Sequence, residues 1–354
     1  MRCERARGRG TGANPTGRFE PYVRESFDDG WGTHDENMAP PATEVRYEKT
    51  DRIIATNQSP DVPFDQSINP YKGCEHGCIY CYARPTHAYL GLSPGLDFER
   101  VIVAKPQGPE RLRVALAKPS YRCQPIALGA NTDPYQPVER SEKITRGILE
   151  VLWEHRHPVT IVTKSNLILR DAELLATLAE HQLVSVILSV TTLDRDLARR
   201  MEPRAATPQK RLEAIAHLNE LGVPVGVLVS PIIPAINDAE LESIMEACRS
   251  HGAAFAGTIL LRLPHELQEL FEGWLDENFP DRKEKVVALL REARGGKINE
   301  ARFGRRMTGT GPYAQLLNRR FELAHRRLGF EATGPRLDTS SFRRPGEQLG
   351  LWRT

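Results

Sequence analysis

Short apolar runs rich in β-branched residues recur along the middle of the chain. They lie near residues 67–71, 125–130, 159–163, 184–190, 225–230 and 256–261, and each has the length of a buried strand. Between them, apolar residues recur three and four positions apart, as in an amphipathic helix. Strands that alternate with helices at a spacing of about 30 residues predict βαβ units and a parallel sheet.

Two of the intervening helices have start signals in the sequence. Ser141 is expected to cap a helix whose apolar face begins at Ile144, because a serine hydroxyl accepts from a free N–H of the first turn. Thr207 followed by Pro208 predicts a second start, since proline is favoured at the first helical position. Gly222 is expected to mark the end of that helix.

The number of units predicts the architecture. Six strand–helix units indicate an α/β fold of the partial (β/α)6 barrel type, because a doubly wound sheet would carry a Gly-x-Gly-x-x-Gly turn after its first strand. We place this core at residues 46–263. Residues 1–45, rich in Gly, Pro and Arg, are predicted to be weakly ordered or disordered. Residues 264–354 are predicted to form a helical, basic extension.

Composition narrows the class of protein. The chain of 354 residues is 40% hydrophobic and 27% charged, as is usual for a globular protein. It has no run of 18 apolar residues, so we predict no transmembrane helix and no membrane partner. The N-terminus lacks the apolar core of a signal peptide, and we expect a cytoplasmic protein. Six cysteines, three of them within eight residues, do not form a disulfide framework.

Charge is unevenly distributed along the chain. The formal net charge is +2, yet residues 282–354 hold 17 Lys and Arg against 7 Asp and Glu. A basic segment of this kind can meet a phosphate backbone. It can equally be a solvated face or pack on the acidic remainder of the chain, so the pattern leaves these readings open.

The segment that indicates a metal or cluster site most specifically carries Cys74, Cys78 and Cys81 in the spacing C-x3-C-x2-C. Fe–S clusters usually have four cysteine ligands. Here three thiolates can each hold a different iron of one cubic cluster, and the fourth iron is then open to a small molecule. A structural zinc site is an alternative, but it needs four ligands, commonly in two pairs, and no second pair is present. A cluster completed by Cys123 is another alternative.

The motif C-x3-C-x-aromatic-C after a first strand resembles the radical S-adenosylmethionine (SAM) superfamily. The runs Asn131-Thr-Asp-Pro, Val162-Thr-Lys-Ser165 and Glu202-Pro resemble, more narrowly, the group around spore photoproduct lyase and a bacterial subgroup of it without a settled substrate. The resemblance implies a barrel of the radical SAM type, one [4Fe–4S] cluster and bound SAM. It also implies reductive cleavage of SAM to a 5′-deoxyadenosyl radical that abstracts hydrogen, with flavodoxin or ferredoxin as electron donor.

The same resemblance assigns roles to residues at the carboxyl ends of the predicted strands, where barrel enzymes build their sites. Tyr80 is expected to pack against the adenine of SAM, Thr132 and Asp133 to accept from its ammonium group, and Lys164 to bind its carboxylate. Ser189 is expected to hydrogen-bond the ribose or the carboxylate. Asp133 before proline is also a common turn former, which is a structural reading of the same residue.

The sequence leaves several alternatives for the substrate. The cysteine that donates a hydrogen atom in spore photoproduct lyase is replaced by Ala130, and Tyr135 nearby is a weak candidate for a relay. A nucleic acid or nucleotide substrate is favoured by the basic segment. The alternatives are a radical enzyme that modifies a peptide or small metabolite, and a nucleic-acid-binding protein with a structural metal site. Glu202 and Arg204, on either side of Pro203, are expected to form an ion pair.

Overall fold

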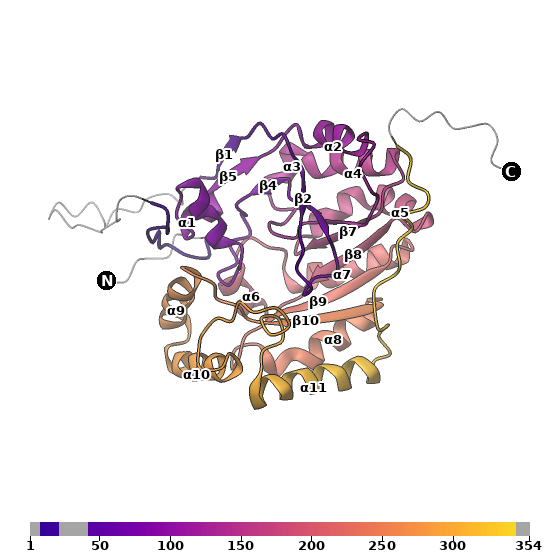
Figure 1. Ribbon diagram of the computed structural model, residues 1–354. Helices are drawn as coiled ribbons and strands as arrows, with labels where there is room; N and C mark the ends of the chain where they lie inside the picture. The colour runs from indigo at the N-terminus through magenta and orange to yellow at the C-terminus, as the bar shows by residue number, and fades with distance from the viewer. Residues whose placement is uncertain (1–7, 21–41, 345–354) are drawn as a thin grey trace, which may run out of the picture.

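The computed structural model describes residues 8–20 and 42–344, and a curved parallel sheet forms its centre (Figure 1). The order of the strands in this sheet is β10-β9-β8-β7-β6-β3-β2, in which β3 to β10 are parallel and β2 runs antiparallel to β3. The strands are β2 (Ile54–Thr56), β3 (Gln66–Ile68), β6 (Ile126–Leu128), β7 (Val159–Thr163), β8 (Val184–Ser189), β9 (Val225–Ile232) and β10 (Phe255–Leu260).

The six parallel strands among the described residues confirm the predicted α/β architecture. No pairing joins β10 to β2 within this part of the chain, so the sheet is an open, partial barrel. A smaller sheet, which the sequence pattern did not indicate, lies beside it in the order β1-β5-β4. Its strands are β1 (Glu44–Tyr47), β4 (Tyr71–Lys72) and β5 (Val101–Ala104).

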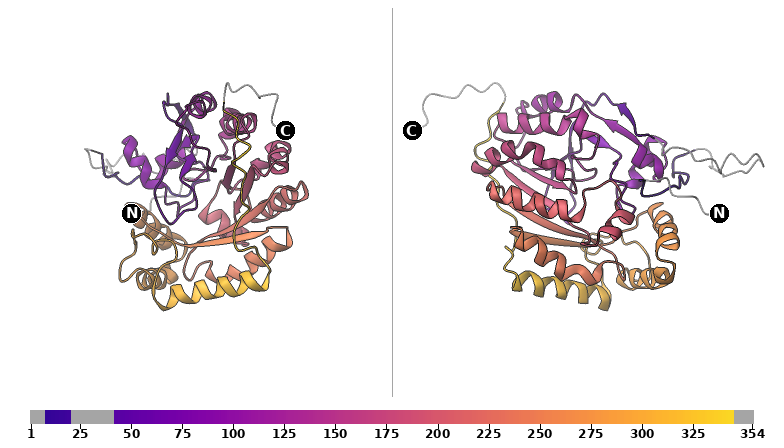
Figure 2. Two further views of the ribbon diagram at one scale, coloured as in Figure 1. Left: turned by 45° about the vertical axis from the view of Figure 1, so that its right-hand side comes forward. Right: turned by 180° about the vertical axis from the view of Figure 1, so that it is seen from behind.

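Helices cover the outer face of the large sheet (Figure 2). Their apolar sides and the buried faces of the strands form one core, in which Ile148, Leu175, Ile161 and Val186 are fully buried. The helices of the barrel are η1 (Arg84–Leu90), α1 (Leu96–Arg100), α2 (Gly108–Leu116), α3 (Glu139–Glu142), α4 (Ile144–Glu154), η2 (Asn166–Asp171), α5 (Ala172–Glu180), α6 (Arg195–Met201), α7 (Pro208–Glu220), η3 (Asp238–Glu240) and α8 (Leu241–Ser250).

The two predicted helix starts have different outcomes. Thr207 caps α7, because its hydroxyl accepts from the N–H of Lys210, and the prediction is confirmed. Ser141 does not cap α4; it lies in α3, and its hydroxyl donates to the carbonyl of Val138. The buried carboxylate of Glu139 accepts from the N–H of Thr145 at 3.0 Å. A charged acceptor therefore takes the place that the sequence assigned to a hydroxyl.

The C-terminal extension is helical, as predicted. It contains α9 (Leu267–Asn278), η4 (Pro280–Arg282), α10 (Lys283–Ala293) and α11 (Gly311–Arg327). After α11 the chain crosses the amino ends of the parallel strands, where the N–H groups of Glu331, Asp338 and Arg343 donate to the carbonyls of Ala254, Gln182 and His155. This end segment thus covers the side of the sheet opposite the carboxyl ends of the strands (Figure 2).

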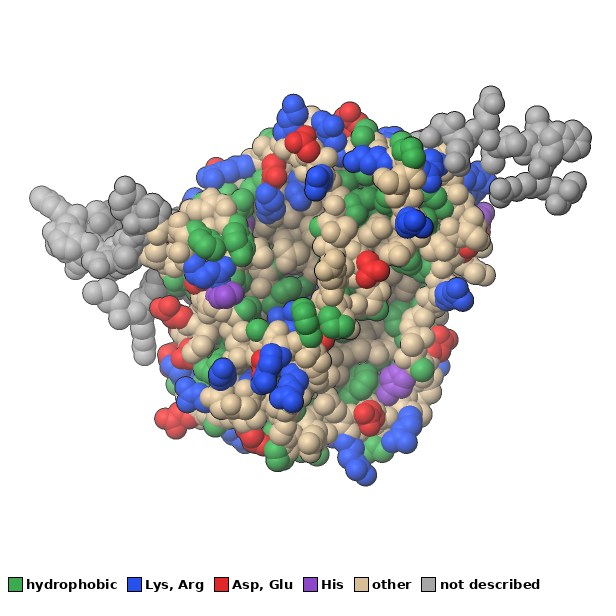
Figure 3. Space-filling model, in the orientation of Figure 1, with side chains coloured by type: hydrophobic (Ala, Val, Ile, Leu, Met, Phe, Trp, Pro, Cys, Tyr) green, Lys and Arg blue, Asp and Glu red, His purple; other side chains and the backbone are tan. Residues whose placement is uncertain are grey.

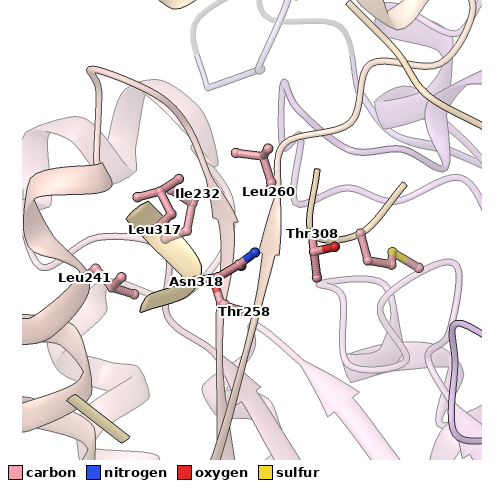
Figure 4. Close-up of a pocket in the computed structure, with 8 residues that line it drawn as sticks. Ile232, Leu241, Thr258, Leu260, Thr308, Leu317 and Asn318 are labelled. Carbon is pink, nitrogen blue, oxygen red and sulfur yellow. The ribbon is translucent and has the colours of Figure 1, made fainter. Parts of the chain in front are cut away.

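The chain between α10 and α11 lies along the free edge of β10. The N–H of Leu260 donates to the carbonyl of Met307, and the N–H of Gly304 donates to Asp61, which belongs to the loop between β2 and β3. Arg306 pairs with the same carboxylate. In Figure 4, Thr308 of this segment lines a small pocket with Leu260 of β10 and Leu317 of α11. The segment therefore connects the two edges of the open sheet.

Two further observations bear on the predicted parts of the chain. Of the segment 1–45, residues 8–20 and 42–45 are described, and Arg9 within it is only 3% exposed. The division into three domains stays a prediction. None of the helices in the described ranges is both long and apolar enough to span a membrane.

We expect Arg294 to be required for the closure at β10. Its buried guanidinium donates to the carbonyls of Leu260, Leu261, Arg305 and Arg306, so Arg294→Met should leave several buried acceptors unsatisfied and lower the free energy of unfolding by about 3 kcal/mol. Urea unfolding measures the effect. Arg291→Met, at an exposed position of α10, is the matched control. Equal stability of the two variants would contradict this assignment.

Candidate active site

The three cysteines of the motif lie on one loop that leaves β4 and leads into η1. Cys74 and Cys78 are buried and Cys81 is partly buried. Burial raises the pKa of Cys74 well above its ordinary value, and the charges of Asp133, Cys78 and Cys81 add to that rise. The thiols are therefore close enough to oppose one another's ionisation. Cations that bind them as thiolates must supply the missing positive charge.

Buried polar side chains hold this loop from several directions. The fully buried Arg84 donates from Nε to the carbonyl of Cys78 at 2.8 Å and forms an ion pair with Glu99. Gln136, after β6, donates to the carbonyl of Gly73 at 3.1 Å and accepts from the N–H of Glu75 at 2.9 Å. The conformation of the loop is thus fixed by the protein before any ligand binds.

Thr132 and Asp133 lie at the carboxyl end of β6, and both have protein partners. Asp133 accepts from the hydroxyl of Thr163 and the N–H of Lys164, both at 2.7 Å, and from the N–H of Tyr135 at 2.9 Å. Its other neighbour is His76 of the cysteine loop, 3.3 Å away. The hydroxyl of Thr132 donates to the carbonyl of Tyr71.

These contacts give Asp133 a structural role that joins the cysteine loop to β7. Burial is the largest effect on the pKa of Asp133 and raises it, but His76 and the hydrogen bonds from Lys164 and Thr163 together hold that pKa below its ordinary value. The turn-forming reading of this residue is therefore present in the structure. Contact of Thr132 or Asp133 with SAM stays a prediction.

Lys164 and Ser189 lie at the carboxyl ends of the next two strands. The ammonium group of Lys164 is 5.8 Å from the centroid of the Tyr80 ring. It forms no ion pair within 4 Å among the residues that the structure describes, although its charge reaches Glu202 and lowers the pKa of that carboxyl. Ser189 is 2% exposed, and its carbonyl accepts from Arg211 at 3.0 Å. The structure brings Lys164 and Tyr80 together beside the cysteine loop.

A buried ion pair anchors Tyr80. Its hydroxyl donates to Glu202 at 2.7 Å, and Glu202 pairs with Arg211 at 3.0 Å. The same carboxylate lies 3.8 Å from the sulfur of Cys78. Burial is the largest effect on the pKa of Glu202 and raises it, but Arg211, Lys164 and the hydrogen bond from Tyr80 together lower that pKa below its ordinary value.

The partner of Glu202 corrects one expectation. Sequence proximity predicted a pair with Arg204, but Arg204 pairs with Glu75 at 3.1 Å. Glu202 follows the end of α6 and faces inward, whereas Arg204 lies beyond it beside the cysteine loop and donates its N–H to the carbonyl of His76. The turn at Pro203 thus separates the two side chains.

Comparison with known proteins places this site in a family. The family model described as the radical SAM superfamily matches residues 68–248, which include the cysteine loop and β4 to β9. The chain belongs to this superfamily. It is a radical SAM enzyme, and the predicted family resemblance is confirmed.

Relatives are found in bacteria and archaea. The chain is 36% identical over 242 residues to an uncharacterised protein of Mycobacterium tuberculosis, covering 67% of this chain and 71% of that protein. It is 29% identical over 219 residues to an uncharacterised protein of Methanocaldococcus jannaschii, covering 62% and 78%.

Solved structures of spore photoproduct lyase share the fold. Its complex with dinucleoside spore photoproduct has a TM-score of 0.55 at 14% identity, covering 81% of this chain and 80% of that chain. A double mutant with bound AdoMet and dinucleoside spore photoproduct has a TM-score of 0.52 at 16% identity, covering 80% and 77%.

The donor set of this radical SAM enzyme fits a cluster better than a single ion. Within residues 8–20 and 42–344, no three His, Cys, Asp or Glu side chains converge as the ligands of one metal ion would. Zinc draws its sulfur ligands to about 2.3 Å and requires such convergence. A cluster instead binds each thiolate through a different iron, so three thiols on one loop, two of them buried and one partly buried, would suit a [4Fe–4S] group.

The two other tyrosines near the site differ in position. Tyr135 is fully buried, and its hydroxyl donates to Asp171 at 3.0 Å, so its hydroxyl is engaged in the core. Its role as a relay stays a prediction. Tyr82 is 48% exposed and its hydroxyl donates to the carbonyl of Ala130. Tyr82 was not among the residues predicted for the site, although it directly follows Cys81 in the sequence.

The described N-terminal residues pack on the cysteine loop of the enzyme. The N–H of Gly10 donates to Glu99, and Arg9 donates to the carbonyl of Glu99. A Cβ at Gly10 would lie only 1.8 Å from the carbonyl oxygen of Gly77, so only glycine allows this approach. The Arg-Gly start, which composition assigned to a weakly ordered segment, thus covers the loop that carries the cysteines.

We expect the Glu202–Arg211 pair to be coupled in the free energy of unfolding. Glu202→Gln and Arg211→Met should each cost about 3–5 kcal/mol, because each leaves one buried charge without its partner. The double variant should cost clearly less than the sum. Urea unfolding of the iron-free protein completes the cycle. Additivity within about 0.5 kcal/mol would show that the two groups act independently.

Proposed function

We propose that this enzyme binds one [4Fe–4S] cluster through Cys74, Cys78 and Cys81 and cleaves SAM reductively to a 5′-deoxyadenosyl radical, which abstracts hydrogen from a substrate. The observation that supports it best is the buried loop of three thiols next to an ammonium group, that of Lys164, without a carboxylate partner in the described chain. The cluster supplies the electron and an open iron for SAM, and flavodoxin or ferredoxin is the class of reductant we expect.

The side chains around this loop have the chemistry to bind SAM. A lysine ammonium suits the methionine carboxylate, and the ring of Tyr80, fixed through Glu202, offers a flat apolar face beside it. Ser189 offers a hydroxyl, and Thr132 an oxygen that still has acceptor capacity after its hydrogen is donated to Tyr71. The burial of these groups keeps water away from the reacting atoms.

We propose further that the substrate is a nucleic acid or a nucleotide. Of the large exposed aromatic side chains in the described ranges, four lie near the cysteine loop or beside the end of β10, and each has an arginine guanidinium within 6 Å of its ring. They are Phe19 and Tyr89 with Arg18, Tyr82 with Arg262, and Phe303 with Arg306. Phe19 and Tyr89 also contact each other, with ring centroids 5.0 Å apart.

Exposed aromatic rings interleaved with cations bind unpaired bases by stacking, while the cations attract the backbone. The face in Figure 3 is hollowed in its middle, and hydrophobic, Lys and Arg side chains border the hollow. A base turned out of its strand would suit such a site, since chemistry on a base requires that it leave the stack. The solved neighbours named above are complexes of a lyase with a dinucleoside, which supports the same substrate class.

Anaerobic reconstitution tests the cofactor assignment. The reconstituted protein should hold about four irons, as a [4Fe–4S] cluster requires, and should form 5′-deoxyadenosine from SAM with dithionite. The Cys74→Ala/Cys78→Ala/Cys81→Ala variant should lose both iron and product, while Cys123→Ala is the matched control. Product formed by the triple variant would overturn the proposal. Nucleotide, DNA and RNA arms of the same assay test the substrate class.

Replacement of Lys164 tests SAM binding separately from turnover. We expect Lys164→Met to keep its iron but to bind SAM about 10-fold to 100-fold more weakly, because a charge-assisted contact contributes about 1.5–3 kcal/mol. Equilibrium binding to the reconstituted protein measures the change. Lys285→Met, on the exposed side of α10, is the control. Unchanged affinity in the Lys164 variant would remove this residue from the SAM site.

A further inference from the structure

Three arginines gather where β10 ends. Arg262 lies two residues beyond the strand, Arg294 donates to the carbonyls of Leu260 and Leu261 at that end, and Arg306 lies in the segment beside it. Their charges interact: burial lowers the pKa of Arg262 and the nearby Arg306 lowers it further. Burial likewise lowers the pKa of Arg294 to about 10, and Arg262 adds to that shift.

The three guanidinium groups differ in their partners. Arg294 donates from its terminal nitrogens to four backbone carbonyls, although its Nε has no hydrogen-bond partner among the described residues. Arg306 is paired with Asp61. Arg262 has no carboxylate within 4 Å in the part of the chain that is described; its Nη1 reaches the sulfur of Met307 at 3.7 Å, and its Nε is buried without a hydrogen-bond partner. Three guanidinium groups thus share this corner with the carboxylate of Asp61. The charge of Glu300, which itself pairs with Arg302, also reaches Arg294, so the corner keeps a surplus of positive charge.

A half-buried guanidinium with a thioether as its neighbour is poorly satisfied. Thioether sulfur is a weak acceptor, whereas the planar fork of arginine is shaped for two oxygens of a carboxylate or phosphate. Asp61, the carboxylate of this corner, is already engaged by Arg306 and by the N–H of Gly304. The charge of Asp61 reaches Arg262, but its ion pair is with Arg306, so Arg262 is left without an ion-pair partner among the described residues.

The position of Arg262 relates this charge to the active site. Its guanidinium carbon is 5.9 Å from the centroid of the ring of Tyr82, the residue that directly follows Cys81. Lys164, which we assign to the SAM carboxylate, follows β7, and two strands, β8 and β9, separate β7 from β10 in the sheet. Lys164 and Arg262 thus lie at the ends of strands that are not neighbours in the sheet, so they can bind different anions.

We propose that Arg262 binds a phosphate group of the substrate, with Tyr82 beside it and with Arg294 and Arg306 adding to the local positive charge. This inference rests on the proposed nucleic acid or nucleotide substrate and assigns the place of its phosphate. The surplus charge matches a phosphodiester or phosphomonoester, and the exposed ring of Tyr82 at the same place offers a surface for the attached base.

Binding measurements test the assignment without turnover. Labelled single-stranded DNA and RNA of ten nucleotides are titrated with the reconstituted protein and followed by fluorescence anisotropy at several salt concentrations. We expect Arg262→Gln to weaken binding about tenfold and to reduce the salt slope by about one phosphate contact. Arg262→Lys should recover part of the affinity, since it keeps the charge but not the fork.

The control removes the same charge from a different surface. Arg319→Gln lies at an exposed position of α11, a helix that packs on α8 outside the sheet, and should bind like the wild type. Urea unfolding of each variant confirms that it is folded. If Arg262→Gln and the wild type bind the oligonucleotides equally, the phosphate assignment is wrong.

A second titration separates the two proposals. If the wild type binds neither DNA, RNA nor mononucleotides, the proposed substrate class fails. Inorganic phosphate then serves as the probe of the site itself, with acetate as the carboxylate for comparison. Phosphate binding that Arg262→Gln abolishes and Arg319→Gln retains would keep the phosphate site without a nucleic acid. Absence of phosphate binding to the wild type, or an equal preference for acetate, would overturn it.

Discussion

The loop of three thiols is the constraint on which the rest of this structure depends. Thiols that lie close together resist ionisation, and burial adds to that resistance, so the loop must be positioned by other groups until cations bind it. Arg84, Gln136 and the pair of His76 with Asp133 hold it from η1, from the loop after β6 and from within. Many of the polar side chains near the cysteine loop therefore serve to hold its conformation.

This explains why residues expected to contact SAM have protein partners. Asp133 has its carboxylate filled by β7 and the cysteine loop, and Tyr80 is fixed through its hydroxyl by Glu202. A side chain that positions a binding group must itself be immobilised, and buried ion pairs such as Glu202 with Arg211 do this because neither charge can leave its partner cheaply. Lys164 differs, because its ammonium group forms no ion pair among the described residues and is therefore available to the carboxylate of a ligand.

The basic C-terminal segment has two functions that composition could not separate. Arg306, Arg320 and Arg327 pair with Asp61, Glu242 and Glu246 of the barrel, so a part of the positive surplus is used to attach the extension and to connect the edges of the open sheet. The same segment brings Phe303 and a cluster of guanidinium groups to the end of β10. The same stretch of chain thus connects the edges of the open sheet and carries arginines that we propose to add positive charge to a phosphate site.

The sequence by itself determined the parallel strands, the cysteine loop and the order of polar groups at the strand ends, because period, spacing and βα order are local properties. It did not determine the small sheet, the cap of α4 by Glu139, or the place of Gly10 against Gly77, which depend on segments far apart in the chain. The partner of Glu202 also depends on the tertiary structure. Arg204 is nearer in sequence, but the buried face of α7 presents Arg211. A desolvated carboxylate pairs with the cation that is buried beside it.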